Sequence, residues 1–193
     1  CMEAVKAAKK LGVTVSCDLN YRKKLWSREK ARSVMTELVK YVDIVIANEE
    51  DASDVFGIKA AESDVTKGQL SEEGYKDVAK QLMDMFSLKG VAITLRESYS
   101  ASDNGWSAMY YDGNEYYFSR KYKIHIVDRV GGGDSFGGGL IYALLNGYAP
   151  QDAVEFAVAA SCLKHTIVGD FNHVTLKEVQ TLAKGDASGR VQR

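Results

Sequence analysis

The sequence predicts an α/β fold in which helices flank a doubly wound, mostly parallel β-sheet. Helical and strand patterns alternate over the first half of the 193 residues. This order is typical of parallel sheets, because two parallel neighbours need a crossover connection that is usually a helix. The predicted strands are also apolar along their interior, as in "DIVIAN" at 43–48. Such a pattern is expected when both faces of a strand are covered.

Three cycles of helix and strand are predicted in the first half of the chain. In the segment 27–41, apolar side chains recur three and four residues apart, which places them on one face of a helix. The strand patterns are instead short runs rich in β-branched residues. In order, we predict a helix at 3–11, a strand at 13–19, a helix at 27–41, a strand at 43–48, a helix at 50–56, a polar surface segment at 59–70, a helix at 71–86 and a strand at 91–95.

The pattern changes in the second half of the chain. Two aromatic-rich runs flank the turn signal "DGN", and this arrangement predicts a β-hairpin. We expect its aromatic side chains, at 110–118, to pack on the sheet and not to stack on nucleic acid bases. Three helices should follow: one after a glycine cluster, ending at 146–147, a buried one at 150–165, and a last one that begins with a capping box of Thr175 and Glu178 and fades after Lys184.

The composition favours an ordinary globular protein of the cytoplasm. Hydrophobic residues make up 46% of the chain, charged residues 26%, and the formal net charge is −1. This charge gives no overall attraction to nucleic acid or to an anionic membrane. No apolar run approaches the roughly 18 residues that cross a bilayer. The cysteines, Cys1, Cys17 and Cys162, are few and odd in number, so we expect free thiols.

A glycine cluster with one aspartate, "DRVGGGDSFGGG" at 128–139, is the strongest chemical signal in the chain. It is not a dinucleotide fingerprint, because Phe136 stands where the last glycine would be, and it lacks the Lys-Ser/Thr of a phosphate-binding P-loop. At a helix start, the bare amides of Gly131, Gly132 and Gly133 could approach a phosphate closely. Asp134 beside them could act as a base for a hydroxyl group. The alternative is a tight turn with close helix packing.

The residues 127–147 resemble the C-terminal signature of the ribokinase-like (PfkB) carbohydrate kinases, whose general form is Asp-Thr-x-Gly-Ala-Gly-Asp. Two further segments, "CDLNYRKKLWS" and "LKHTIVGDFNHVT", resemble the 2-keto-3-deoxygluconate kinase branch of that family. The resemblance covers nearly the whole chain. It implies a ribokinase-like fold in which 1–185 is the C-terminal part of the kinase domain and 186–193 a polar tail. The N-terminal part and its lid would then be missing, which agrees with a chain that opens directly on a helix.

The resemblance implies a role for each matching position. Asp134 would take the proton from the primary hydroxyl of the sugar, and the three glycines before it would form an anion hole for the transferring phosphoryl group. Arg22 and Asp170 would bind the acid sugar, and a planar guanidinium suits the carboxylate of such a substrate. The alternatives are a surface arginine in a loop and a solvated loop carboxylate.

ATP and Mg²⁺ are the cofactors that the resemblance implies. The nucleotide contacts besides the three glycines would be Asn20, Arg22, Asn48, Thr94, Arg96 and Ser98. Asp51 and Glu50 would organise Mg²⁺ through water. The alternative for these two acids is that they stabilise the start of a helix.

Departures from the general signature leave undecided whether a monovalent cation site near this loop is intact. Arg129 and Val130 stand where the pattern has threonine, and Gly132 stands where it has alanine. His165, at the end of the buried helix, is expected to be structural, and no Cys/His spacing for zinc occurs.

The expected activity is therefore ATP-dependent phosphorylation of 2-keto-3-deoxygluconate to the 6-phosphate, by a protein whose partners are small molecules and which could form homo-oligomers. A fructokinase-type sugar kinase is the nearest alternative, and a substrate panel separates the two. A second alternative is a nucleotide-binding fragment without catalysis, since the chain by itself is expected to have little kinase activity.

Overall fold

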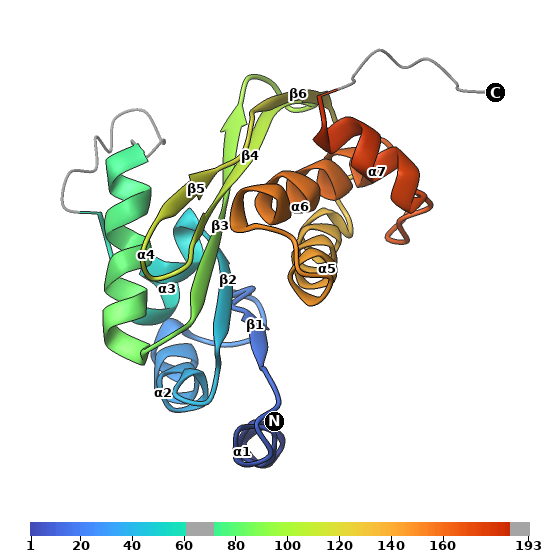
Figure 1. Ribbon diagram of the computed structural model, residues 1–193. Helices are drawn as coiled ribbons and strands as arrows, with labels where there is room; N and C mark the ends of the chain where they lie inside the picture. The colour runs from blue at the N-terminus through green and yellow to red at the C-terminus, as the bar shows by residue number, and fades with distance from the viewer. Residues whose placement is uncertain (61–71, 186–193) are drawn as a thin grey trace. The chain divides into compact units, whose positions relative to one another are not determined.

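The computed structural model describes residues 1–60 and 72–185, shown as helices, strands and loops in Figure 1. The described chain forms two compact units. The first contains Cys1–Leu95 and Met109–Tyr116, and the second contains Arg96–Ala108 and the chain from Tyr117 onward. Most of the predicted polar segment 59–70, the first residue of the helix predicted at 71–86, and the tail 186–193 lie outside the described residues.

The first unit carries the predicted parallel strands and their helices. Its elements are α1 (Met2–Lys10), β1 (Ser16–Asp18), α2 (Arg28–Val39), β2 (Ile44–Asn48), α3 (Glu49–Phe56), α4 (Glu72–Phe86) and the start of β3 (Gly90–Ser98). Strand β2 pairs in parallel with both β1 and β3, with Asp18 opposite Ile46 and Asn48 opposite Thr94. The predicted succession of helix and parallel strand is thereby confirmed for this unit.

Strand β1 is shorter than predicted because its first residues complete the preceding helix. Gly12 has a positive φ of 71°, and the next N–H, that of Val13, donates to the carbonyl of Ala8. Glycine reaches this left-handed conformation without strain, which is why it often ends helices. The backbone of 12–13 is therefore used by the end of α1, and the strand begins only at Ser16.

The second unit combines antiparallel strands with three helices. Strands β3, β4 (Asp103–Tyr111) and β5 (Tyr116–Phe118) have residues in both units, and the other elements of the second unit are β6 (Tyr122–His125), α5 (Gly132–Leu145), α6 (Pro150–Lys164) and α7 (Leu176–Ala183). The strand order is β1-β2-β3-β4-β5, and β6 pairs antiparallel with β4. The sheet is therefore mixed. Strand β6 was not among the sequence predictions.

Helices α5 and α6 pack closely in the second unit. A Cβ on Gly139 of α5 would lie 3.1 Å from the Cα of Ala157 in α6. This glycine therefore allows close helix packing, which is the structural alternative given for the glycine cluster. Helix α6 is buried along most of its length, as predicted. In the part of the chain that the structure describes, no helix is both long and apolar enough to cross a membrane.

Asp43 joins three segments of the first unit and gives a prediction about stability. Its buried carboxylate accepts the Val15 N–H at 2.9 Å and pairs with Lys9 and Lys89 at 3.3 and 3.0 Å. Burial by itself would raise the pKa of this carboxyl, but the Val15 N–H and the two ammonium groups outweigh it and hold the pKa below its usual value. We expect Asp43→Ala to lower the free energy of unfolding by about 2 kcal/mol, because the Val15 N–H loses its acceptor.

Denaturant unfolding measures this loss, with Asp84→Ala in an exposed pair with Lys80 as a control that should cost about 0.5 kcal/mol or less. A folded-state pKa below the unfolded value of about 3.9 stabilises the fold above that pH and loses this effect as the pH falls through the folded pKa. The difference between wild type and Asp43→Ala should therefore shrink below about pH 4. A difference that stays constant down to pH 3 would contradict this role of the ionised carboxylate.

Candidate active site

The glycine cluster forms the turn that begins α5. Gly131 is the residue before the helix, with φ 78° and ψ −1°, the left-handed conformation that favours glycine. A Cβ on Gly131 would clash with the carbonyl oxygen of Asp170, and a Cβ on Gly132 would lie 2.5 Å from the His165 ring. Backbone conformation and packing therefore account for these two glycines without any ligand.

Gly133 is different, because neither its conformation nor its surroundings require glycine. It is exposed, its φ is not positive, and a Cβ built on it would have no neighbour within 4 Å. The side chain of Asp134, the next residue, is also exposed. As the second and third residues of α5, both carry N–H groups that have no partner inside a helix. An anion could therefore approach the backbone at Gly133 with a carboxylate beside it.

Asp128 holds this turn in place. Its Oδ1 accepts the Val130 N–H at 3.0 Å, and its Oδ2 accepts the Gly169 N–H at 2.8 Å. The Val130 N–H, and to a smaller extent the Gly169 N–H, lowers the pKa of the Asp128 carboxyl. Asp128 thus connects the glycine turn to the loop that contains Asp170, one of the two predicted sugar-binding residues.

His165 packs under the turn as a structural residue. The side chain is 4% exposed. Its ring packs at a tilt of 59° against Trp106, with 4.8 Å between ring centroids, and its Nδ1 lies 2.7 Å from the Ser161 carbonyl. Because a carbonyl only accepts, Nδ1 carries the proton in this contact. Burial lowers the pKa of His165, so the ring beneath Gly132 is neutral near pH 7.

Arg129, one of the departures from the family signature, has a structural role. The Arg129 guanidinium donates to the Ala101 carbonyl and, at 3.4 Å, to Oδ1 of the fully buried Asn104. Asn104 in turn donates to Ser98 Oγ at 3.1 Å. Ser98 is thereby engaged in holding the β3–β4 hairpin, while Arg96 is exposed. Asn104 could not be identified from the sequence, because its role depends on contacts between segments.

The predicted nucleotide contacts of the first unit lie at one edge of its parallel strands. Asn20 follows β1, Asn48 ends β2, and Thr94 lies opposite Asn48 in β3. Ligands of open α/β sheets bind outside the carboxyl ends of the strands. Asn20 has a positive φ of 40°, and the exposed Arg22 donates to the Tyr21 carbonyl at 3.1 Å. Asn20, Asn48 and Thr94 therefore lie at the edge where ligands of such sheets bind.

Asp51 is occupied as a helix cap in this structure. Its side chain is 5% exposed; Oδ1 accepts the Tyr21 N–H at 3.0 Å, and Oδ2 accepts the Asn48 N–H at 3.4 Å. Asn48 Oδ1 accepts the N–H groups of Glu50 and Asp51, both at 2.9 Å, which completes a capping box. Burial raises the pKa of Asp51. These contacts fit the alternative in which Asp51 stabilises the start of a helix. Of the two acids predicted to organise Mg²⁺, only Glu50 is exposed. Within 1–60 and 72–185, no group of three or more His, Cys, Asp or Glu side chains could hold a metal ion.

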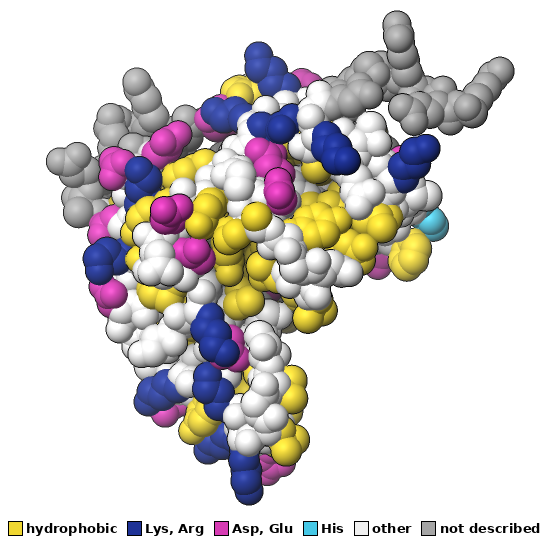
Figure 2. Space-filling view, in the orientation of Figure 1, with side chains coloured by type: hydrophobic (Ala, Val, Ile, Leu, Met, Phe, Trp, Pro, Cys, Tyr) yellow, Lys and Arg dark blue, Asp and Glu magenta, His cyan; other side chains and the backbone are white. Residues whose placement is uncertain are grey.

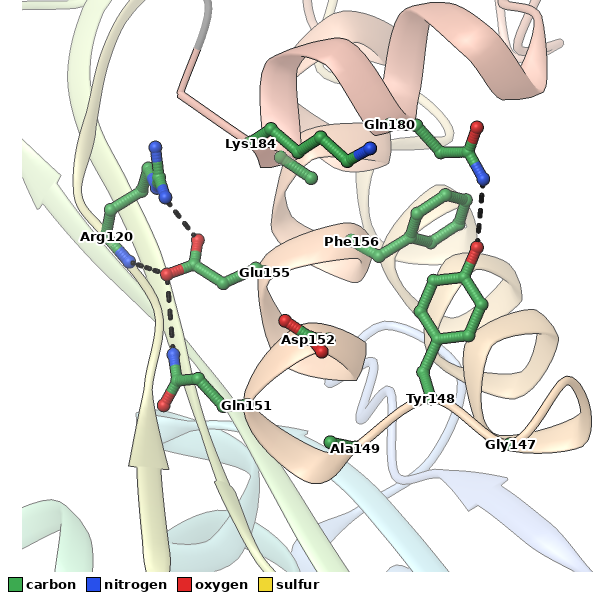
Figure 3. Close-up of a pocket in the computed structure, with 11 residues that line it drawn as sticks. Arg120, Gly147, Tyr148, Ala149, Gln151, Asp152, Glu155, Phe156, Gln180 and Lys184 are labelled. Atoms are coloured by element: carbon green, nitrogen blue, oxygen red, sulfur yellow. Dashed lines mark hydrogen bonds and ion pairs between the residues drawn. The ribbon is translucent and has the colours of Figure 1, made fainter.

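A cavity of about 560 Å³ in the second unit lies at the other end of α5 (Figure 3). Arg120 and Glu155 form an ion pair of 3.2 Å at one wall, and Tyr148 accepts a hydrogen bond of 3.0 Å from Gln180 at the opposite wall. Hydrophobic side chains gather on the surface over α5 and α6 (Figure 2). At the cavity, Tyr148 packs edge-on against Phe156. The 14 residues of α5 separate this cavity from the glycine turn by about 20 Å. It is therefore not part of the candidate active site.

Comparison with known proteins decides the family. The sequence model described as "pfkB family carbohydrate kinase" matches residues 1–173, a range that contains every candidate site residue. The chain belongs to the pfkB family of carbohydrate kinases. The resemblance inferred from the glycine cluster and its two companion segments is thereby confirmed.

Three pfkB-family relatives and fold neighbours define the similarity. The crystal structure of 2-dehydro-3-deoxygluconokinase from Thermotoga maritima is 50% identical, with a TM-score of 0.89, and the match covers 95% of this chain and 54% of that one. The 2-dehydro-3-deoxygalactonokinase of Haloferax volcanii is 29% identical over 97% of this chain and 52% of that protein. A structure from Escherichia coli, described as a ribokinase II in complex with ATP and Mg²⁺, shares the fold, with a TM-score of 0.71 and 22% identity over 94% of this chain and 52% of that one.

These matches confirm the predicted ribokinase-like α/β fold. 2-Dehydro-3-deoxygluconate is another name for 2-keto-3-deoxygluconate, so they also confirm the predicted similarity to kinases of that sugar acid. The chain spans about half the length of the relatives it matches.

Proposed function

We propose that the protein carrying this chain transfers the γ-phosphoryl group of ATP to the primary hydroxyl of 2-keto-3-deoxygluconate, giving the 6-phosphate. The observation that carries the proposal is the start of α5, where the exposed Asp134 follows a glycine with open space around it. The 50% identity to an enzyme named for this substrate supports the choice of sugar, and the neighbour that contains ATP and Mg²⁺ supports the choice of donor.

In the proposed reaction, Asp134 accepts the proton of the attacking hydroxyl. The sugar oxygen forms a bond to the γ-phosphorus, the bond from that phosphorus to the bridging oxygen breaks, and ADP leaves with the electron pair. The N–H groups of the α5 turn stabilise the negative charge on the phosphoryl oxygens, as expected for a reaction that depends on positioning and electrostatics. The exposed Glu50 would hold Mg²⁺ through water, and the metal would neutralise charge on the β- and γ-phosphates.

Arg22 and Asp170 are proposed to bind the sugar acid. Arg22 is exposed, and its hydrogen bond to the Tyr21 carbonyl uses a single guanidinium donor, so other donors can bind a carboxylate. We expect Arg22→Glu to raise KM for 2-keto-3-deoxygluconate about 100-fold, because a charge-assisted hydrogen bond is replaced by repulsion. Lys24→Glu, at another exposed cation of the same loop, should change KM less than threefold.

A coupled assay of the complete protein with ATP tests the proposal. The panel contains 2-keto-3-deoxygluconate, its galactonate epimer and fructose, and we expect turnover of the first that exceeds turnover of fructose at least 100-fold. The epimer is included because the Haloferax relative is named for it. Preference for fructose, with no effect of Arg22→Glu, would show a fructokinase-type enzyme and refute the acid-sugar proposal.

A further inference from the structure

Lys164 is a fully buried lysine that the proposed reaction does not use. It is the last residue of α6, and its side chain is 0% exposed. The ammonium Nζ donates to the Ile167 carbonyl at 3.0 Å. Removing an ammonium group from water is costly unless oxygen atoms or a negative charge replace the water. A buried lysine at this place therefore needs an explanation beyond packing.

The side chain of Lys164 lies directly behind the glycine turn. Its Cε is 3.2 Å from the position that a Cβ on Gly131 would take. Its charge also helps to lower the pKa of Asp128, after the Val130 and Gly169 N–H groups. A positive charge thus lies against a backbone carbonyl, beside the turn that begins α5.

Backbone carbonyl oxygens are also ligands of monovalent cations, and the residues present here do not fit a free ion beside the Lys164 ammonium. The Ile167 carbonyl is already an acceptor of the ammonium, and the alkyl chain of Lys164 occupies the space against Gly131. A second cation here would displace or repel the first. A side chain of the protein, Lys164, therefore occupies the place where a monovalent cation would bind near this loop.

We infer that the Lys164 ammonium is a built-in substitute for a bound monovalent cation, which orders the glycine turn and stabilises the charge of the transferring phosphoryl group. The inference rests on the proposed function. A fixed charge behind the turn would favour the transition state without the need to recruit an ion, because a preorganised positive group requires no reorganisation at the moment of reaction. Lys164 would act through the turn as a positioning residue.

Two substitutions separate this role from simple packing. Lys164→Met keeps the length of the apolar chain and removes the charge, whereas Lys164→Ala also opens space for a small ion. We expect turnover to fall about 10- to 100-fold in both, with KM changed less than threefold. Potassium or ammonium chloride should restore Lys164→Ala at least fivefold and leave Lys164→Met unrestored. Lys177→Ala, at an exposed lysine of α7, is the control.

The complete wild-type protein should be equally active in potassium, sodium and tetramethylammonium chloride of the same ionic strength. A second readout is independent of activity: potassium or ammonium should raise the melting temperature of Lys164→Ala relative to tetramethylammonium, and should not do so for the wild type. Wild-type activity or melting that depends strongly on potassium would overturn the inference. The inference would also be overturned if neither potassium nor ammonium raised the turnover or the melting temperature of Lys164→Ala. An inactive wild type would refute the proposed function, and the melting experiment would still decide the role of Lys164.

Discussion

Replacing Asp134 with asparagine is expected to lower the turnover number of the complete protein about 1,000-fold, since positioned general bases contribute 10²- to 10⁴-fold. Asparagine has the same shape but cannot accept the proton of the attacking hydroxyl. The side chain of Asp134 is exposed, so the substitution removes no buried contact. KM for both substrates should change little, because the base acts mainly in the transition state.

The chain contains a matched control for this substitution. Asp152 is the third residue of α6, as Asp134 is the third residue of α5, and both side chains are exposed. Each carboxylate stabilises its helix start by roughly 0.3–1 kcal/mol, so Asp152→Asn should cost as much stability as Asp134→Asn. Only Asp134→Asn should reduce turnover. Near-wild-type activity of Asp134→Asn, or equal losses in the two variants, would remove Asp134 from the role of base.

Elements with local signals could be predicted from the sequence. The capping box of Thr175 and Glu178 predicted the start of α7, and the structure contains both of its hydrogen bonds. Helices α5 and α6 likewise end within a residue or two of the predicted positions, because Asn146 and the residues after Lys164 interrupt their apolar periodicity. These signals are carried by residues three or four apart, so they do not depend on the rest of the chain.

Strand β6 shows what local signals leave out. Its residues alternate between half-buried Tyr122 and Ile124 and exposed Lys123 and His125, a pattern of period two that was available in the sequence. The run is only 4 residues long and becomes a strand by pairing with β4. A short edge segment of this kind is stabilised by its partner, which the sequence does not specify.

The candidate site was predictable where the chemistry is carried by residue type. The glycines and Asp134, and the polar residues at strand ends, were found in this way. Asp128, Asn104 and Lys164 were not assigned a role, because each acts through contacts with distant segments. Lysine is almost never fully buried without a partner, so a lysine in the apolar helix predicted at 150–165 was the available signal. Asp51 shows the opposite case, in which a predicted metal-site residue is used as a cap.

Gly133→Ala is the substitution that best separates an anion site from a tight turn. Gly133 has open space at its Cβ position and no positive φ, and alanine favours helices by about 0.5–1 kcal/mol over glycine. We therefore expect unchanged or slightly higher stability. Turnover should nevertheless fall about 100-fold, as when one oxyanion donor is lost, because the methyl group would stand where a phosphoryl oxygen approaches the amide.

Gly131→Ala should lose stability together with activity, unlike Gly133→Ala. Comparing the two variants therefore tests the site directly. Alanine at φ 78° costs roughly 1–2 kcal/mol, and its methyl group would also clash with the Asp170 carbonyl. The free energy of unfolding, from denaturant titration, should therefore fall by more than 2 kcal/mol, with activity lost in parallel because the turn itself moves. If Gly133→Ala kept full turnover while Gly131→Ala unfolded, the cluster would be needed for its backbone conformation alone. A stable but inactive Gly133→Ala protein can be explained only by a group that must approach this amide from solvent.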